Sequence, residues 1–181
     1  MNLRKKIVLA IGALVAIIVI GGLLMENTFT VERQAVIPAS PDLAYTYASD
    51  LTKHALWNAR KARDDTMQFS FPEKKHAGEG AVYEWTSENS GAGTCRISRA
   101  ETSHRLDFDI TLKGKGTGHA FWIFEPEGQN TKLTRGFEGD IPVPILGSWL
   151  VLILNPAEQL GTDFDSEIAA FSRVLKTAAQ N

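Results

Sequence analysis

The chain has 181 residues, of which 44% are hydrophobic and 22% charged, and its formal net charge is −2. This composition excludes a disordered or fibrous protein, and the small charge gives no electrostatic basis for binding nucleic acid. The single cysteine, Cys95, excludes an intrachain disulfide, and the sequence has no Cys/His cluster of the kind that holds zinc. We therefore expect no metal site, no cofactor and no nucleic-acid partner.

The N-terminal segment, residues 1–26, is predicted to be an uncleaved single-pass membrane anchor. Residues 7–25 carry no charge, and nineteen helical residues span roughly 28 Å, close to the hydrocarbon thickness of a bilayer. Arg4, Lys5 and Lys6 precede this run, so the positive-inside rule predicts a cytoplasmic N-terminus and a domain on the extracytoplasmic, periplasmic side. A cleaved signal peptide is the alternative, but the apolar run is long and ends without a small-x-small site.

Residues 27–181 are predicted to form one domain. Alternation and β-branched residues over 28–37 predict a strand, and Ser40 and Pro41 are suited to begin a helix over 41–49. A second short helix is predicted over 51–57. The hydrophobic period then changes to two, which predicts strands over 67–71, 80–86, 94–100, 106–112, 119–125 and 131–140.

The C-terminal part returns to helical periodicity. Residues 141–154 are strongly apolar but too few to span a bilayer, and Trp149 is suited to a bilayer interface. This segment is predicted either to be a buried core helix or to touch lipid and gate access of a ligand. From Ala157 to Ala179, apolar residues recur every three or four positions, which predicts one long amphipathic helix.

The order of these elements indicates the fold class. Strands segregated from helices are typical of an α+β domain. The long C-terminal helix is the only predicted element large enough to cover the concave face of a curved antiparallel sheet. A cavity between the sheet and this helix is therefore expected.

Several short motifs occur in a recognisable order. They are Ala35-Val36-Ile37-Pro38, Pro41-Asp42-Leu43-Ala44-Tyr45, Asp50-Leu51, Trp57, Gly78-Glu79-Gly80-Ala81-Val82-Tyr83-Glu84-Trp85 and Gly161-Thr162-Asp163-Phe164. Over residues 31–176 the chain resembles the START-like superfamily, also called SRPBCC, and within it the polyketide cyclase/dehydrase group. The resemblance implies a helix-grip fold, in which a curved antiparallel sheet wraps around a long C-terminal helix. His54, Ala59 and Arg135 stand at or near positions where many relatives have tryptophan.

The candidate cavity residues are mainly aromatic. They are Trp57, Tyr83, Trp85, Phe108, Ile110, His119, Phe121, Arg135, Phe137, Trp149 and Phe164. Ordinary core packing is the alternative for most of the aromatic residues, and a structural or surface role is the alternative for His119. Arg135 lies in phase with Leu133 and Phe137, and a buried cation needs an anionic partner, either an internal carboxylate or a ligand head group.

Three functions remain open from the sequence. The favoured prediction is a membrane-anchored domain that binds a lipid or another hydrophobic small molecule in its cavity. The first alternative is an enzyme like the polyketide cyclases and dehydratases, with His119 or Glu84 as acid or base; it ranks lower because the sequence offers few titratable groups for the cavity. The second alternative is a protein-interaction module whose cavity is filled by side chains.

Overall fold

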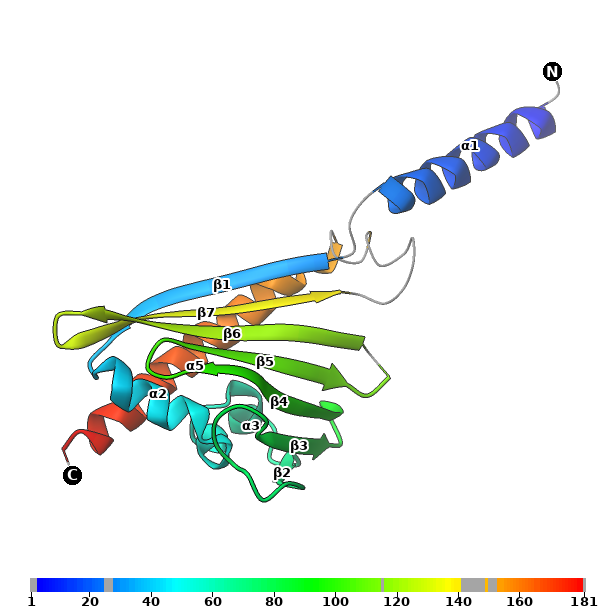
Figure 1. Cartoon of the computed structure of the whole chain (residues 1–181). Helices are drawn as coiled ribbons and strands as arrows, with labels where there is room; N and C mark the ends of the chain where they lie inside the picture. The colour runs from blue at the N-terminus through cyan, green and yellow to red at the C-terminus, as the bar shows by residue number, and fades with distance from the viewer. Residues whose placement is uncertain (1–2, 25–27, 115, 141–148, 150–152, 181) are drawn as a thin grey trace.

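The computed structural model describes residues 3–24, 28–114, 116–140, 149 and 153–180 (Figure 1). A long N-terminal helix, α1 (Leu3–Leu24), precedes a domain of seven strands and several helices. The helices of the domain are α2 (Pro41–Ser49), the 3-10 helix η1 (Leu51–Leu56), α3 (Ala59–Arg63) and α5 (Pro156–Ala178). The strands are β1 (Thr28–Ile37), β2 (Gln68–Ser70), β3 (Val82–Ser87), β4 (Gly91–Glu101), β5 (Arg105–Leu112), β6 (Gly116–Glu127) and β7 (Asn130–Asp140).

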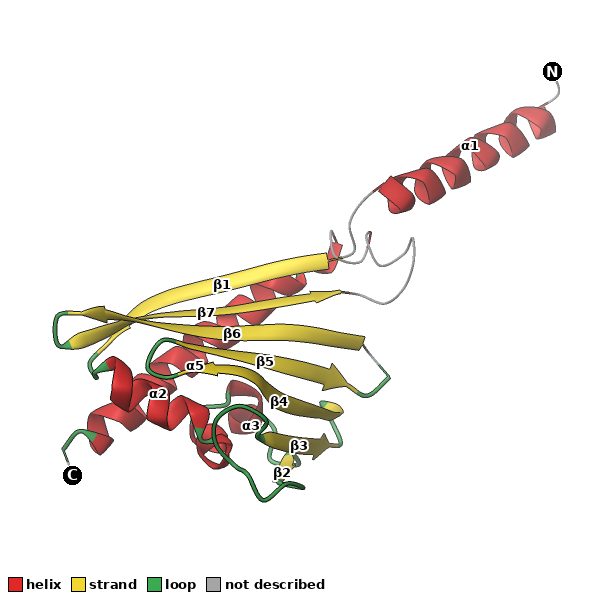
Figure 2. Ribbon diagram, in the orientation of Figure 1, coloured by secondary structure: helices red, strands yellow, loops and turns green. Residues whose placement is uncertain are grey.

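The strands form one antiparallel sheet in the order β1-β7-β6-β5-β4-β3-β2. Strands β2 to β7 follow each other as a meander, and β1 joins the far edge by pairing with β7 from Thr28–Asp140 to Ile37–Thr131. The helix α5 runs across one face of this sheet, and α2 lies at the end of the sheet where β1 finishes (Figure 2). The predicted α+β helix-grip architecture is confirmed.

Helix α5 buries the apolar stripe that its spacing predicts. Phe164, Ile168, Phe171 and Leu175 are all buried, at intervals of three or four residues. The Phe171 ring packs edge-on against Trp57 and Trp122, with centroid distances of 4.8 and 5.0 Å. Helix α5 thereby joins the sheet and the short helices into one core.

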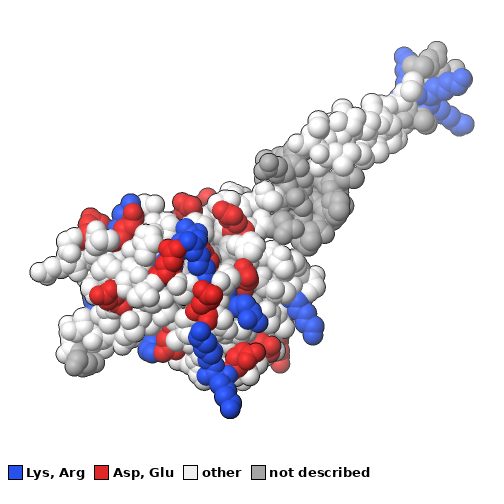
Figure 3. Space-filling model, in the orientation of Figure 1, with Lys and Arg blue, Asp and Glu red and all other residues white. Residues whose placement is uncertain are grey.

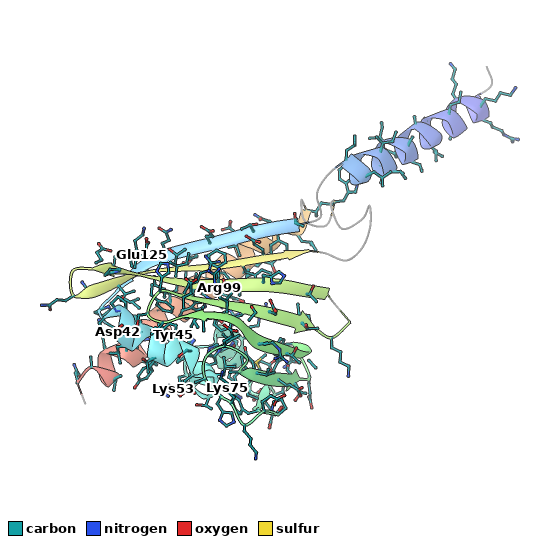
Figure 4. All side chains as sticks on the ribbon, viewed as in Figure 1. Asp42, Tyr45, Lys53, Lys75, Arg99 and Glu125 are labelled. Carbon is teal, nitrogen blue, oxygen red and sulfur yellow. The ribbon has the colours of Figure 1, made fainter. Side chains whose placement is uncertain are left out.

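Helix α2 closes the same face of the sheet at one end. Ser40 caps the helix by accepting a hydrogen bond from the Leu43 amide, as its position predicts. The ring of Tyr45, labelled in Figure 4, meets Phe124 of β6 edge-on at 6.1 Å. The opposite face of the sheet is open and charged, with pairs such as Lys132–Glu125 and Arg99–Glu101.

The short helices before β2 differ from the prediction. The helix predicted over 51–57 is a 3-10 helix, and α3 was not predicted because five residues with three cations show no apolar periodicity. Asn58 begins α3 by accepting a hydrogen bond of 2.8 Å from the Lys61 amide. The helix expected over 141–154 lies mostly outside the described residues, which include only Trp149, Ile153 and Leu154 of that stretch.

Helix α1 projects away from the domain, and beyond its first turn it carries no charged side chain (Figure 3). Within the stretch Arg4–Leu24, the most apolar window of 18 residues has a mean hydropathy of 3.0, and only 6% of this window is buried. Its length and composition suffice to cross a membrane, and a signal sequence would satisfy the same criteria. Its charged residues, Arg4, Lys5 and Lys6, gather at the free end.

Candidate functional site

A cavity of about 320 Å³ lies between the sheet and the helices α3 and α5. Its wall on the sheet side comes from six strands and is aromatic or aliphatic apart from Arg135 of β7. The other residues are Phe29 of β1, Phe69 of β2, Tyr83 and Trp85 of β3, Ile110 and Leu112 of β5, Ala120 of β6 and Phe137 of β7. This volume lies near the lower limit for small-molecule sites, which suits a single-chain or compact ligand rather than a whole two-chain phospholipid.

The cavity exists because the residues that point inward become smaller along β6. From the end covered by α2, these residues are Phe124, Trp122, Ala120 and Gly118, all of them buried. The two large rings fill the space beneath α2 and α5, whereas Ala120 leaves space empty and Gly118 makes room for the ring of Phe137. The space between the sheet and α5 forms a groove. The inward-facing residues of β6 thus divide this groove into a half filled by side chains and a hollow half.

Two glycines allow aromatic rings to lie flat on the hollow half. A Cβ atom added at Gly93 of β4 would overlap the Trp85 ring, and one added at Gly118 would overlap the Phe137 ring. Both rings line the cavity. The close approach of ring and backbone therefore shapes the wall, and a side chain at either glycine would displace its ring.

One buried ion pair crosses the cavity wall, between Arg135 of β7 and Glu167 of α5. The two side chains are only 14% and 7% exposed. The second carboxylate oxygen of Glu167 accepts a hydrogen bond of 3.1 Å from the Ala59 amide at the start of α3. Glu167 is thus the internal partner that a buried Arg135 was expected to need, and it also holds α3 against α5.

The guanidinium of Arg135 is also packed against aromatic rings. Its Cζ atom lies 3.9 Å from the centroid of the Phe164 ring and 5.3 Å from that of Trp122. Burial lowers the pKa of Arg135 to about 9, so the group is still a cation at neutral pH. Its Nε–H has no hydrogen-bond partner among the residues that the structure describes.

A second charged group forms the rim of the cavity. Asp163 of α5 accepts a hydrogen bond of 2.6 Å from Arg63, and its other oxygen lies 3.9 Å from Nε of Arg60. Gln159, Asp163 and Glu167 all line the cavity and recur every four residues on α5. This spacing could have revealed from the sequence a polar stripe that faces the cavity.

Asp64 positions α3 and the β2 edge of the site. Its carboxylate accepts hydrogen bonds from Thr66, Ser87, Asn89 and Ser90, so the turn after β3 is fixed to the end of α3. These bonds, led by that from Ser87, hold the pKa of the Asp64 carboxyl well below its usual range. Asp64 is therefore ionised at any pH at which the protein is expected to work.

The structure brings together only part of the predicted site. Six of the candidates line the cavity: Tyr83, Trp85, Ile110, Arg135, Phe137 and Phe164. Trp57 and Phe108 instead lie in the closed core, where they contact His54 at the filled end of the groove. Leu112 and Ala120 were missed, although both are in phase with predicted neighbours, Leu112 with Ile110 and Ala120 with the buried ring of Trp122.

Two predicted cavity residues lie on the opposite face of the sheet. His119 is exposed and its Nδ1 lies 2.8 Å from Asp109, and Phe121 lies beneath the guanidinium of Arg105, 5.1 Å from its ring centroid. Residues 119 and 121 alternate with the buried Ala120 and Trp122, so they point away from α5. The expectation that His119 and Phe121 face the cavity is wrong.

Trp149 belongs to neither face of the sheet. Its indole Nε1–H donates a hydrogen bond of 3.0 Å to the Ile18 carbonyl of α1, and its ring packs on Gly21. Trp149 does not line the cavity. It instead connects the region before α5 to the second half of α1.

The cavity lies at the end of the domain from which α1 departs. Phe29 at the start of β1 and Leu160 at the start of α5 both line it. Figure 1 shows the starts of β1 and α5 at the same end of the domain, the end nearer to α1. Just before α5, Ile153 and Leu154 expose 72% and 52% of their surface, so this end of the domain is apolar outside as well as inside.

The buried histidine His54 predicts how stability depends on pH. It packs against Trp57 and Tyr83, and its Nε2 lies 3.0 Å from the Ala48 carbonyl oxygen. Burial, assisted by the nearby charge of Arg135, lowers its pKa from 6.5 to about 4. The unfolded chain therefore takes up a proton between pH 6.5 and 4 that the folded chain does not. The free energy of unfolding should fall by up to roughly 3 kcal/mol across this window, with no further loss from His54 below it.

Urea denaturation at pH 7, 5.5 and 4 measures this effect. His54→Leu should flatten the pH dependence, whereas His104→Gln, at an exposed histidine, should leave it unchanged. An equal pH dependence in the wild type and in His54→Leu would show that His54 is not the group responsible.

The fold and the apolar cavity define a helix-grip protein of the START-like, or SRPBCC, class. A family profile described as "Polyketide cyclase / dehydrase and lipid transport" matches residues 28–176. The chain belongs to this family. A search of curated proteins found no match.

Solved structures show the same fold at low sequence identity. The SA2116 protein of Staphylococcus aureus is 13% identical with a TM-score of 0.65, and covers 85% of this chain and 97% of its own. Norcoclaurine synthase of Thalictrum flavum is 15% identical with a TM-score of 0.61, over 87% of this chain and 91% of its own. The CV1439 protein of Chromobacterium violaceum is 16% identical with a TM-score of 0.59, over 81% and 96%. Each likeness concerns the fold.

Proposed function

We propose that the chain is a membrane-anchored domain that binds a lipid or another hydrophobic small molecule in the cavity between the sheet and α5. The observation that carries this proposal is the hollow half of the groove, where aromatic and aliphatic side chains surround about 320 Å³ of unfilled space. Cores normally pack without voids much larger than a water molecule, so an apolar space of this size favours a bound molecule.

The position of the cavity supports a membrane as the source of the ligand. The hollow end of the domain is the end that carries α1, and the exposed Ile153 and Leu154 lie there too. If α1 spans the bilayer, an apolar molecule would have a short path through water between membrane and cavity. The positive charges in the first turn of α1 favour an N-terminus in the cytoplasm and a domain on the other side.

The enzyme alternative finds less support in the geometry. Both carboxylates on the cavity wall are already paired, Asp163 with Arg63 and Glu167 with Arg135. His119 and Glu84, the acid or base candidates from the sequence, are exposed on the other side of the sheet. A general base must take up a proton from its substrate, and protonation of either carboxylate would weaken its ion pair.

Filling the cavity is expected to abolish binding. Ala120 is buried on the cavity wall, so Ala120→Leu places a larger apolar group in the empty space and should leave stability nearly unchanged. Retention of the apolar ligand should fall at least about tenfold, which corresponds to about 1.4 kcal/mol. The ligand retained per chain is measured by mass spectrometry after copolymer extraction of the full chain from membranes.

The matched control is Thr117→Leu, which introduces the same side chain on β6 but on the exposed face. It should retain the ligand as well as the wild type does. Equal retention by all three proteins would place the ligand elsewhere and contradict the proposed site.

The membrane topology has its own test. The only native cysteine, Cys95, is buried, so a new thiol at an exposed site can be labelled selectively. Thr102→Cys, in the exposed turn between β4 and β5, should react with a membrane-impermeant maleimide in intact cells. Labelling only after lysis would place the domain in the cytoplasm, and a mass that lacks the first residues would show that α1 is a cleaved signal sequence.

A further inference from the structure

Trp149 packs into a notch on α1 that two glycines create. Its indole Nε1–H donates a hydrogen bond of 3.0 Å to the Ile18 carbonyl oxygen. On a helix, the side chains three and four residues later lie over such a carbonyl, and here those positions are Gly21 and Gly22. A Cβ atom added at Gly21 would lie 2.8 Å from the Trp149 ring, whereas one added at Gly12 would meet nothing within 4 Å among the described residues. The Trp149 ring therefore fits this part of α1 closely.

The position of the notch along α1 determines its depth in a bilayer that α1 spans. Ile18 lies six residues before Leu24, the last residue of α1, which corresponds to about 9 Å along the helix axis. Helix α1 cannot move outward by two turns, because Lys5 and Lys6 would then enter the hydrocarbon from the other side. When α1 spans the bilayer, the Trp149 ring thus lies at or below the edge of the hydrocarbon on the side of the domain.

The hydrogen bond of Trp149 suits such an apolar surrounding. An indole N–H without a partner is unfavourable in lipid, because no water is present to accept the bond. The Ile18 carbonyl supplies the acceptor from within the protein. Tryptophan is enriched at both interfaces of a bilayer, because its ring combines a large apolar surface with one polar group.

Two further apolar side chains near this contact are exposed. Ile153 and Leu154, just before α5, expose 72% and 52% of their surface. Ile153 follows Trp149 by four residues, so their Cα atoms lie no more than about 15 Å apart. Transfer of apolar surface from water into lipid is favourable, by about 25 cal/mol for each Å². A bilayer beside α1 would therefore stabilise both side chains.

We propose that Trp149, Ile153 and Leu154 form a lipid-docking surface, which inserts into the leaflet on the side of the domain and is held there by the notch at Gly21 and Gly22. This inference rests on the proposed membrane-anchored function and deepens it, because it names the partner of this end of the domain. The cavity opens at the same end. Docking thus places the cavity beside the leaflet, without a layer of water between them.

Nitroxide labels test whether this surface lies in lipid. Cys95 is buried, so a label can be attached selectively to Leu154→Cys or, as a control, to Val36→Cys. The native side chains at these two positions are 52% and 53% exposed, but Val36 lies at the end of β1 beside α2, far from α1 (Figure 2). The full chain is reconstituted in phosphatidylcholine liposomes. Power saturation then compares the collisions of each label with oxygen, which concentrates in lipid, and with a water-soluble nickel chelate.

The label at residue 154 should collide preferentially with oxygen, and the label at residue 36 with the nickel chelate. Gly21→Leu should displace Trp149 and abolish the oxygen preference at residue 154, whereas Gly12→Leu on the same helix should keep it. A nickel preference at residue 154 without a change in α1 would overturn the inference. An oxygen preference that survives Gly21→Leu, or that is lost equally in both glycine variants, would overturn it as well.

Ligand retention by the wild type and by Ala120→Leu separates this inference from the proposed function. A nickel preference at residue 154, together with retention that is lost in Ala120→Leu, would overturn docking while ligand binding stands. An oxygen preference together with equal retention by the two proteins would support docking, while the proposed ligand site would fail. A mature chain that lacks α1 would overturn both the anchor and the docking surface.

Discussion

Replacing Arg135 with methionine is expected to lower the free energy of unfolding by about 3–5 kcal/mol, the usual cost of leaving one charge of a buried pair without its partner. The carboxylate of Glu167 is only 7% exposed, so it has little access to water once Arg135 is removed. Helix α3 should loosen as well, because Glu167 also accepts the hydrogen bond of the Ala59 amide. The loss is measured by urea denaturation at pH 7.

The double variant Arg135→Met/Glu167→Gln distinguishes the contribution of the Arg135–Glu167 ion pair to stability from that of the ring contacts of Arg135. It removes both charges and retains an acceptor for the Ala59 amide, so it should recover most of the stability lost in the single variant. A double variant as unstable as Arg135→Met would show that the arginine contributes through its contacts with Phe164 and Trp122 instead.

Phe171→Ala is expected to have an effect of similar size, about 3–5 kcal/mol, because it removes a fully buried ring from the centre of the core. Phe171 lies between Trp57 and Trp122 in the filled half of the groove. Its removal should also extend the empty space toward that half. We therefore expect the variant to retain longer apolar ligands than the wild type does, measured as the chain length of the extracted molecules.

Phe121→Ala is the control for this prediction. Phe121 lies on the other face of the sheet, partly exposed beside Arg105, so its loss should cost no more than about 1 kcal/mol. A similar loss of stability in both variants would argue that sheet propensity, rather than packing against α5, accounts for the effect.

Periodicity predicted most of the fold. The hydrophobic period of two predicted the strands of the meander, and the helical period after β7 predicted α5. The apolar stripe of α5 is buried, as its spacing indicates. Ser40 and Pro41 marked the start of α2 correctly because their local chemistry decides a helix start regardless of tertiary context. Helix α3 was not predicted, because it is held in place by contacts with α5 and by Asp64 rather than by an apolar stripe of its own.

The site was harder to predict than the fold. On β6, Phe121 and Ile123 are apolar on one face while Trp122 and Phe124 are apolar on the other, so alternation alone did not indicate which face is buried. His119 and Phe121 were therefore assigned to the wrong side. The decrease in size from Trp122 through Ala120 to Gly118 is visible in the sequence and would have indicated the hollow end.

Trp57 and Phe108 illustrate a different limit. Both are inward-facing and aromatic, as a cavity residue would be, but they lie in the half of the groove that Phe171 and His54 fill. Whether an inward-facing residue lies in the filled or the hollow half depends on where α2 and α5 cross the sheet. A local sequence pattern does not predict these crossings. The pairing of Arg135 with Glu167 likewise joins residues distant in sequence and follows only from the fold.

The most direct test of a ligand-binding cavity is mass spectrometry of organic extracts from the full chain, purified from membranes with a copolymer and compared with Ala120→Leu prepared in parallel. Bilayer lipids are common to both samples and cancel. We predict one apolar molecule per chain that is enriched in the wild type. Identical extracts from the two proteins would contradict the account and favour a protein-interaction role for the domain.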